Sequence, residues 1–251
     1  MRKVCRIGQI VPSSNTTMET EIPAMLNAHA QIHGTHFTFH ASRMRMKTVK
    51  KEELAAMDAE SDRCALELSD ARVDVLGYAC LVAIMSMGKS YHRVSQERLH
   101  GRTVENGAPA PVITSAGALI DALHTLGAKR IAVVAPYMKP LTQLVIDYIE
   151  HEGVEVIESR ALEIPDNIEV GRHDPARLPD IVAGMNGVAS ADAVVLSACV
   201  QMPSLPAIAE VEARTGKPVV TAAVATTYSM LKALELKPVV PGAGALLSGA
   251  Y

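Results

Sequence analysis

Three short segments of this 251-residue chain recur later in the chain, in the same order and at a nearly constant spacing. A strand-like segment ending in proline recurs after 124 residues, a Ser-Arg pair after 117, and an apolar segment ending in cysteine after 119. The matched pairs are Arg6–Pro12 with Arg130–Pro136, Ser42-Arg43 with Ser159-Arg160, and Asp74–Cys80 with Asp192–Cys199. Such a repeat predicts two similar halves. We expect residues 1–114, completed by 224–251, to form the first half and residues 115–223 the second.

Short apolar runs alternate with amphipathic stretches along the whole chain. The runs are rich in Val, Ile and Ala and lack a polar face, which is typical of strands covered on both sides. We expect strands at Val4–Val11, His36–Ala41, Val73–Ala79, Pro111–Thr114, Arg130–Ala135, Glu155–Leu162, Ala193–Ala198 and Pro218–Thr221. We expect helices at Lys50–Ala71, Thr114–Leu126, Met138–Glu152, Leu205–Arg214 and Val224–Leu234. The alternation predicts an α/β fold of two parallel-sheet halves, with the active site in the cleft between them.

Composition excludes several classes of protein. The chain has 49% hydrophobic and 20% charged residues, a globular balance, and its formal net charge of −3 provides no basic excess for nucleic acid. No apolar stretch reaches the roughly 18 residues of a membrane span, and no signal-peptide-like run follows the basic N-terminus. Four cysteines are too few for a disulfide scaffold. We therefore expect a cytoplasmic protein that binds neither nucleic acid nor membranes.

Two of the four cysteines, Cys80 and Cys199, occupy equivalent places in the repeat, each directly after an apolar strand. Ligands of open parallel sheets bind outside the carboxyl ends of the strands, so we expect the two thiols to face one cleft. Backbone N–H groups at a helix N-terminus lower the pKa of a thiol, and we expect that effect here. Cys64 lies on the apolar face of a predicted helix and Cys5 within the first strand, so we expect both to be core residues.

Further polar residues follow the predicted strands. The loop Pro12–Thr17 is rich in small hydrogen-bonding side chains, and its Asn15 either caps a helix or helps to bind a carboxylate. Tyr137 follows the repeated proline and either packs in the core or donates a hydrogen bond into the cleft. The pattern alone makes Asn167 a turn former. The polar segment Ser86–Asn106 forms either a solvated face or a cover for the cleft.

The sequence contains no recognisable metal or nucleotide motif. Two histidine pairs have a metal-like spacing, His29 with His33 and His36 with His40, but neither has the glutamate of a zinc-protease motif. The second pair also falls on or beside a predicted strand, where residues i and i+4 are far apart. The glycines near the C-terminus have no helix after them, so they do not form a dinucleotide fingerprint. We therefore expect no metal and no cofactor.

Five segments carry a resemblance to a known family. They are Val11–Glu19, Tyr78–Met85, Ala135–Tyr137, Ile164–Asn167 and Ser197–Ser204. The first loop and the two cysteine segments closely resemble those of the bacterial maleate cis–trans isomerases, and the other two fall where that family has a substrate-contacting Tyr and Asn. The likeness runs over essentially the whole chain. It implies a member of the aspartate/glutamate racemase superfamily, with the duplicated α/β fold of that superfamily and its pseudo-twofold axis.

The departures from other members of the superfamily point the same way. Its amino-acid racemases typically carry Cys-Asn-Thr in the first motif and Cys-Thr in the second. Here Cys80 is followed by Leu81-Val82, and Cys199 by Val200-Gln201, so the polar groups that those racemases place near an α-amino acid are missing. Arylmalonate decarboxylases keep one of the two cysteines, whereas this chain has both.

The resemblance implies a covalent mechanism for converting maleate into fumarate. Cys80 would add to an olefinic carbon as a thiolate and give a succinyl-type adduct, while Cys199 would protonate the neighbouring carbon and later take the proton back. The family likeness makes Asn15, Tyr137 and Asn167 the residues that hold the substrate. Backbone N–H groups near the cysteines, at Leu81, Val82, Val200 and Gln201, would stabilise the developing negative charge.

The resemblance also implies a homodimer, no cofactor, and a place in the breakdown of N-heteroaromatic compounds such as nicotinate. Two other functions stay open. A cofactor-independent racemase or decarboxylase of a related carboxylic acid would use the same cysteine pair, and it would exchange an α-proton with solvent or release CO2. A non-catalytic carboxylate sensor or a thiol redox protein would bind ligand without turnover or form a reversible Cys80–Cys199 disulfide.

Overall fold

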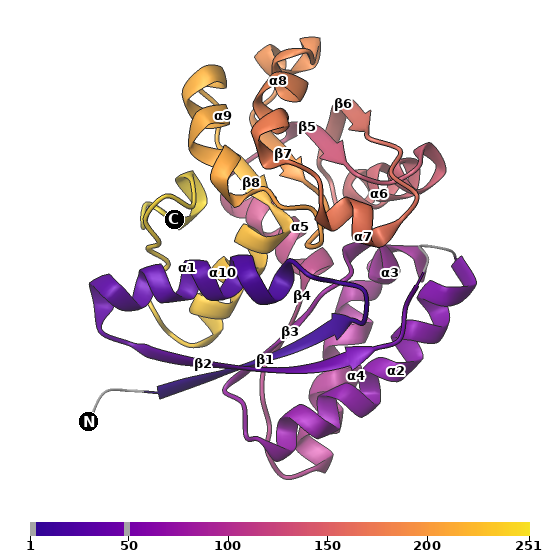
Figure 1. The fold of residues 1–251 in the computed structure, drawn as a ribbon, viewed down its shortest axis with the longest axis vertical. Helices are drawn as coiled ribbons and strands as arrows, with labels where there is room; N and C mark the ends of the chain where they lie inside the picture. The colour runs from indigo at the N-terminus through magenta and orange to yellow at the C-terminus, as the bar shows by residue number, and fades with distance from the viewer. Residues whose placement is uncertain (1–3, 48–50) are drawn as a thin grey trace.

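Two four-stranded parallel sheets form the centre of the protein (Figure 1), in a computed structural model that describes residues 4–47 and 51–251. The first sheet contains β1 (Val4–Pro12), β2 (His36–Met44), β3 (Val75–Tyr78) and β4 (Val112–Thr114), in the order β2-β1-β3-β4. The second contains β5 (Arg130–Ala135), β6 (Glu155–Ala161), β7 (Ala193–Ser197) and β8 (Val219–Thr221), in the order β6-β5-β7-β8. All neighbouring strands are parallel. The identical order confirms the predicted α/β fold with two similar halves.

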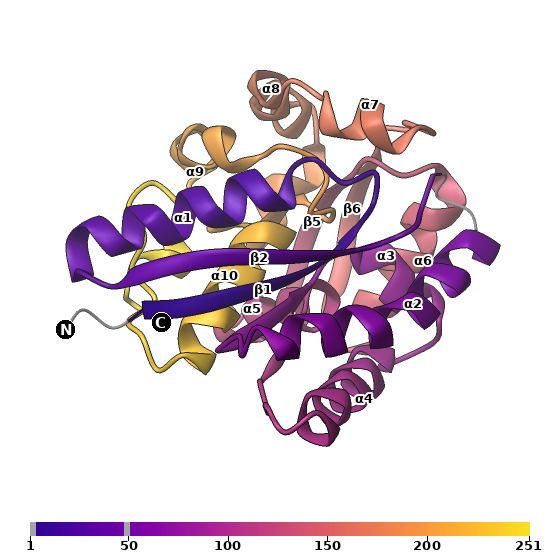
Figure 2. The same ribbon diagram turned by 60° about the horizontal axis from the view of Figure 1, so that its bottom comes forward.

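Helices cover the sheets on both faces. They are α1 (Met18–His33), α2 (Lys51–Asp70), α3 (Leu81–Ser86), α4 (Tyr91–Glu105), α5 (Ser115–Thr125), α6 (Lys139–His151), α7 (Asn167–Gly171), α8 (Leu178–Ala183), α9 (Ile208–Thr215) and α10 (Ala222–Ala233). Figures 1 and 2 show α1 on one face of the first sheet and α2 with α4 on the other. Helix α10 packs against α5, α1, β3 and β8, and therefore contacts both halves. The boundaries of the two halves at residues 114 and 224 stay a prediction.

Burial of the strands on both faces explains why the sequence pattern identified them. Every residue of β3, β7 and β8 is buried, because helices cover both faces of each sheet. All eight predicted strands are present, and their ends differ from the prediction by at most three residues. Such runs of Val, Ile, Leu and Ala provide the apolar burial that stabilises the fold.

The helices agree less uniformly with the prediction. Helix α2 begins at Lys51, and the predicted first residue, Lys50, lies outside the described residues. The predicted helix Leu205–Arg214 begins as a 3-10 turn, Leu205–Ala207, before α9. The polar segment Ser86–Asn106 contains α4, which packs along α2 and buries one of its faces.

The helices and the metal-binding side chains of the described residues bear on the expected partners. None of the helices there is long and apolar enough to cross a membrane. Nor do residues 4–47 and 51–251 contain a group of three or more His, Cys, Asp or Glu side chains that could hold a metal ion. The rings of His29 and His33 lie against each other on α1, and His29 Nδ1 lies 3.1 Å from the carbonyl oxygen of Val239.

Candidate active site between the two halves

A small cavity lies between the two halves, at the carboxyl ends of the strands. Its walls are formed by Pro12, Asn15, Met46, Cys80, Val82, Tyr137, Asn167, Cys199, Val200 and Gln201. The cavity thus brings together both cysteines of the repeat and all three predicted substrate-holding residues. Leu81 is buried and does not line it.

Strand register explains why residues so far apart in the sequence meet here. In the first sheet Ile10 of β1 pairs with Tyr78 of β3, so the chain that follows each strand emerges at the same edge and carries Cys80 there. In the second sheet Val133 of β5 pairs with Val195 of β7, which places Tyr137 and Cys199 at the equivalent edge. The two edges face each other across the cavity, as the repeat predicts.

Cys80 links the end of β3 to the beginning of α3. Its backbone has φ +86° and ψ +71°, in the left-handed region that residues other than glycine rarely adopt. The side chain is partly buried, and burial raises the pKa of the thiol to about 12, against a smaller opposite effect from the backbone N–H of Ala83. The neighbouring Cys199 and Asp58 raise it further. The expectation of a lowered pKa is therefore wrong, because desolvation outweighs the helix N-terminus.

Cys199 follows β7 in the second half and is 8% exposed. Burial raises the pKa of its thiol, and three neighbours oppose that shift: the hydroxyl of Tyr137 and the backbone N–H groups of Gln201 and Met202. The two backbone N–H groups have fixed positions beside the sulfur, so they would stabilise a thiolate formed there during a reaction. Cys5 and Cys64 are fully buried in the core, as predicted.

Asn15 has a fixed orientation at the start of α1. Its Oδ1 accepts hydrogen bonds from the backbone N–H groups of Thr17 at 3.0 Å and Met18 at 2.9 Å. An amide atom that accepts from two N–H groups is the oxygen, so the other amide atom is the nitrogen, Nδ2. Since Asn15 lines the cavity, Nδ2 is the atom left to meet a ligand there. The side chain thus caps the helix through its oxygen, which is one alternative from the sequence, and the binding of a carboxylate by its nitrogen stays a prediction.

Tyr137 and Asn167 line the cavity from the second half. Tyr137 is 5% exposed, and its hydroxyl donates to the carbonyl oxygen of Ala198 at 3.0 Å, which aligns the ring beside Cys199. Asn167 is the first residue of α7, and its Nδ2 donates to Ser14 Oγ of the first half at 2.8 Å. The residue that looks like a turn former in the sequence is thus part of a contact between the halves.

The side chain of Gln201 joins the halves more extensively. Its Oε1 accepts from the backbone N–H of Thr16 at 2.8 Å, and its Nε2 donates to the carbonyl oxygens of Asn167 at 2.7 Å and Ser14 at 3.2 Å. In return Thr17 Oγ1 donates to the carbonyl oxygen of Gln201 at 2.7 Å. We call this set of contacts the Gln201 clamp. From the sequence, only the backbone N–H of Gln201 was expected to take part in the site, and the contacts of its side chain were not predicted.

The backbone around the two thiols offers further donors. As the first two residues of α3, Leu81 and Val82 have N–H groups without a partner inside the helix. The backbone N–H of Gln201 is directed at the sulfur of Cys199. Val82 and Val200 add apolar walls on opposite sides of the cavity. A small planar acid with two carboxylates would meet polar donors and apolar surface here, with one thiol from each half.

Sequence reasoning missed two residues that line this cavity and one buried residue that joins the two halves. Pro12 is the last residue of β1 and Met46 follows β2, and both line the cavity. Glu21 on α1 is buried, and its Oε1 accepts from the N–H groups of Ser204 at 2.7 Å and Leu205 at 2.8 Å. Pro12 stands in the repeat and could have been identified from it. No local signal distinguishes Met46 or Glu21 from ordinary core and helix residues.

Comparison with known proteins agrees with this geometry. Residues 7–247 match a family described as arylmalonate decarboxylase. A maleate isomerase from Pseudomonas putida is 74% identical over 251 residues, which cover the whole of both chains. A maleate isomerase from Pseudomonas putida S16, solved with maleate, is 68% identical with a TM-score of 0.98 and covers 99% of each chain.

A third relative carries a trapped reaction intermediate. It is a cysteine-to-serine mutant of the Nocardia farcinica maleate cis–trans isomerase with a covalently bound succinylcysteine intermediate. It is 45% identical to this chain, with a TM-score of 0.94, and the match covers 99% of this chain and all of the relative. By these similarities, the chain belongs to the arylmalonate decarboxylase family and, within it, to the maleate isomerases.

Proposed function

We propose that this protein converts maleate into fumarate through a covalent succinyl-cysteine intermediate. The observation that carries the proposal is the cavity that brings one thiol from each half, Cys80 and Cys199, to a single small site. The full-length identity to maleate isomerases and the succinylcysteine adduct in the Nocardia farcinica relative support the same chemistry.

The reaction is an addition followed by an elimination. The Cys80 thiolate forms a bond to one olefinic carbon, the π bond opens, and the proton of Cys199 passes to the neighbouring carbon. Rotation about the resulting single bond brings the carboxylates apart. The Cys199 thiolate then removes that proton, the double bond re-forms, and the carbon–sulfur bond breaks to release fumarate. Electrons and protons balance over the cycle, so the steps consume no oxidant, no reductant and no outside proton.

The cavity residues have distinct parts in this scheme. The amide nitrogen of Asn15, the side chain of Asn167 and the hydroxyl of Tyr137 hold the two carboxylates. Negative charge develops on the carboxylate next to the carbon that becomes protonated, and fixed backbone donors stabilise such charge strongly in a water-poor site. The N–H groups of Leu81, Val82, Val200 and Gln201 supply them, while the apolar side chains of Val82 and Val200 exclude water.

A proton NMR time course of the purified, reduced protein with maleate tests the proposal. We expect the olefinic signal of fumarate to grow, and to stay absent with Cys80→Ser. Cys199→Ala should slow turnover strongly yet still give an adduct in the intact mass, because the nucleophile remains. Cys64→Ser is the matched control: it removes a buried thiol outside the cavity and should affect stability only. Turnover retained in Cys80→Ser would refute the assignment of the nucleophile.

The match to the arylmalonate decarboxylase family favours one alternative, a racemase or decarboxylase of a related acid that uses the same cysteine pair. This activity would appear as deuterium exchange at an α-carbon or as CO2 release, with no loss of maleate. Maleate binding without any product would instead indicate a sensor.

We also propose that the protein is a cytoplasmic homodimer that acts in the breakdown of N-heteroaromatic compounds such as nicotinate. The resemblance of the motifs to the maleate isomerase family supports the dimer and the pathway. The free thiols of Cys64, Cys80 and Cys199 support a reducing compartment, where such groups persist. Sedimentation equilibrium of the purified protein tests the dimer, and a mass of 26.7 kDa for the species in solution would contradict it.

A further inference from the structure

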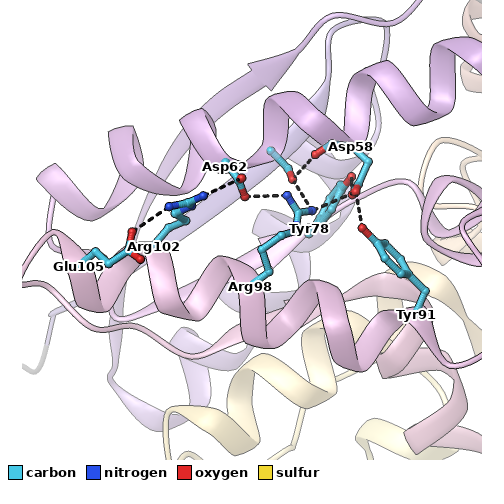
Figure 3. A network of polar contacts seen from close by, with 8 residues as sticks. Asp58, Asp62, Tyr78, Tyr91, Arg98, Arg102 and Glu105 are labelled. Atoms are coloured by element: carbon cyan, nitrogen blue, oxygen red, sulfur yellow. Dashed lines mark hydrogen bonds and ion pairs between the residues drawn. The ribbon is translucent and has the colours of Figure 1, made fainter.

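A network of polar side chains lies behind the strand end that carries Cys80 (Figure 3). Asp58 and Asp62 on α2 face Arg98 and Arg102 on α4, and Tyr78 reaches Asp58 from the end of β3. We propose that Asp58 is a positioning residue for Cys80: its carboxylate anchors, through Tyr78, the strand end from which Cys80 follows. The inference rests on the proposed role of Cys80.

Asp58 occupies the centre of this network. It is 3% exposed, and both of its oxygens have partners: Oδ1 accepts from Tyr78 Oη at 2.9 Å, and Oδ2 accepts from Tyr91 Oη at 2.7 Å and from Arg98 at 3.0 Å. A buried carboxylate held by three donors has a defined position. Arg98 also contacts Asp62 at 2.6 Å, so it has a second partner closer to solvent.

The network is tied to the nucleophile by the chain itself. Tyr78 is fully buried, and only Ala79 separates it from Cys80, which sits in its left-handed conformation. A hydrogen bond from Tyr78 to α2 therefore fixes the last residue of β3 and the direction in which the chain leaves the sheet. A displacement of about 1 Å at a reacting atom can cost on the order of a hundredfold in rate, so this anchoring matters for catalysis.

Alkylation of Cys80 by iodoacetamide at pH 8, followed by peptide mass, tests the anchor without any turnover of maleate. Tyr78→Phe removes the hydrogen bond to Asp58 and keeps the aromatic ring. The alkylation rate should rise severalfold, because a thiol that leaves its buried position is less desolvated and ionises more readily. Tyr91→Phe is the matched control: Tyr91 donates to the same carboxylate from α4 and does not precede Cys80 in the chain, so the alkylation rate should not change.

The same two variants separate kcat from KM in the isomerisation of maleate. We expect kcat to fall about tenfold in Tyr78→Phe with KM nearly unchanged, because the residues that hold substrate lie elsewhere in the cavity. Equal alkylation rates in Tyr78→Phe and Tyr91→Phe overturn the anchor, whether or not the protein turns over maleate. An unchanged kcat in Tyr78→Phe overturns it as well.

Discussion

Replacing Gln201 by leucine tests whether the Gln201 clamp holds the two thiols in register. Leucine fills a similar space and removes every polar contact of the side chain. The change leaves the carbonyl oxygen of Asn167 without its 2.7 Å donor, and the N–H of Thr16 without its 2.8 Å acceptor. Because Gln201 is 2% exposed, water does not easily replace these contacts.

The expected loss of stability follows from those two contacts. An unpaired buried backbone group costs about 1–3 kcal/mol, and a group that water can partly reach costs about 1 kcal/mol or less. The carbonyl group of Asn167 would be left buried and unpaired. The N–H of Thr16 belongs to an exposed residue, so water can partly reach it. We therefore expect the free energy of unfolding to fall by about 2–3 kcal/mol, which for a chain of this size lowers Tm by roughly 4–12 °C.

Urea unfolding followed by circular dichroism measures the change, with turnover of maleate measured in parallel. The control is Gln143→Leu, since Gln143 is exposed on α6 and makes a single hydrogen bond to Asp147. That variant should lose less than about 0.5 kcal/mol. A loss for Gln201→Leu no larger than the control would show that the clamp does not hold the halves together.

Three further results are expected. The rate of isomerisation should rise about tenfold per pH unit above neutrality, because the raised pKa of Cys80, about 12, leaves the thiol protonated there and ionisation must precede addition. Hydrogen bonds from Arg93 and Ser90 hold the pKa of Glu152 at about 2, below its usual 4.5, so this carboxylate stabilises the fold above that range and loses the effect as the pH falls through it. Glu152→Gln should therefore cost about 1–2 kcal/mol in urea unfolding at pH 7 and nothing at pH 2. Gly171→Ala would put a Cβ 2.6 Å from the Nε2 of Gln201, so it should lower Tm and turnover together in thermal and kinetic assays.

Most of the sheet architecture could be predicted because burial on both faces leaves a simple trace in the sequence. Strands such as β3 and β7 consist entirely of buried residues, so they read as uninterrupted apolar runs. The short helices α7 and α8 have five and six residues, which is too few to show a helical period. The role of the segment that contains α4 was left open, because most of this helix is polar and only a narrow face of it is buried against α2.

The residues of the site could be predicted where a local sequence pattern marks them, and not where distant parts of the chain decide their role. The two cysteines, Asn15 and Tyr137 follow strands, and strand order with register brings them together. The Gln201 clamp was missed because its partners, such as Thr16, lie 185 positions away in the chain. The pKa of Cys80 was predicted in the wrong direction because a helix end is local information, whereas desolvation depends on the second half closing over the thiol.

The left-handed backbone of Cys80 has a consequence for the evolution of the chain. Glycine adopts φ +86° without strain, whereas any residue with a Cβ loses about 1–2 kcal/mol there. Selection for conformational stability alone would thus replace this cysteine by glycine. Comparing the unfolding of Cys80→Gly with that of Cys80→Ala, which both lack the thiol, measures this cost. The nucleophile is retained at a position where chemistry and backbone preference oppose each other, so a stabilised descendant of this fold would tend to lose its isomerase activity first.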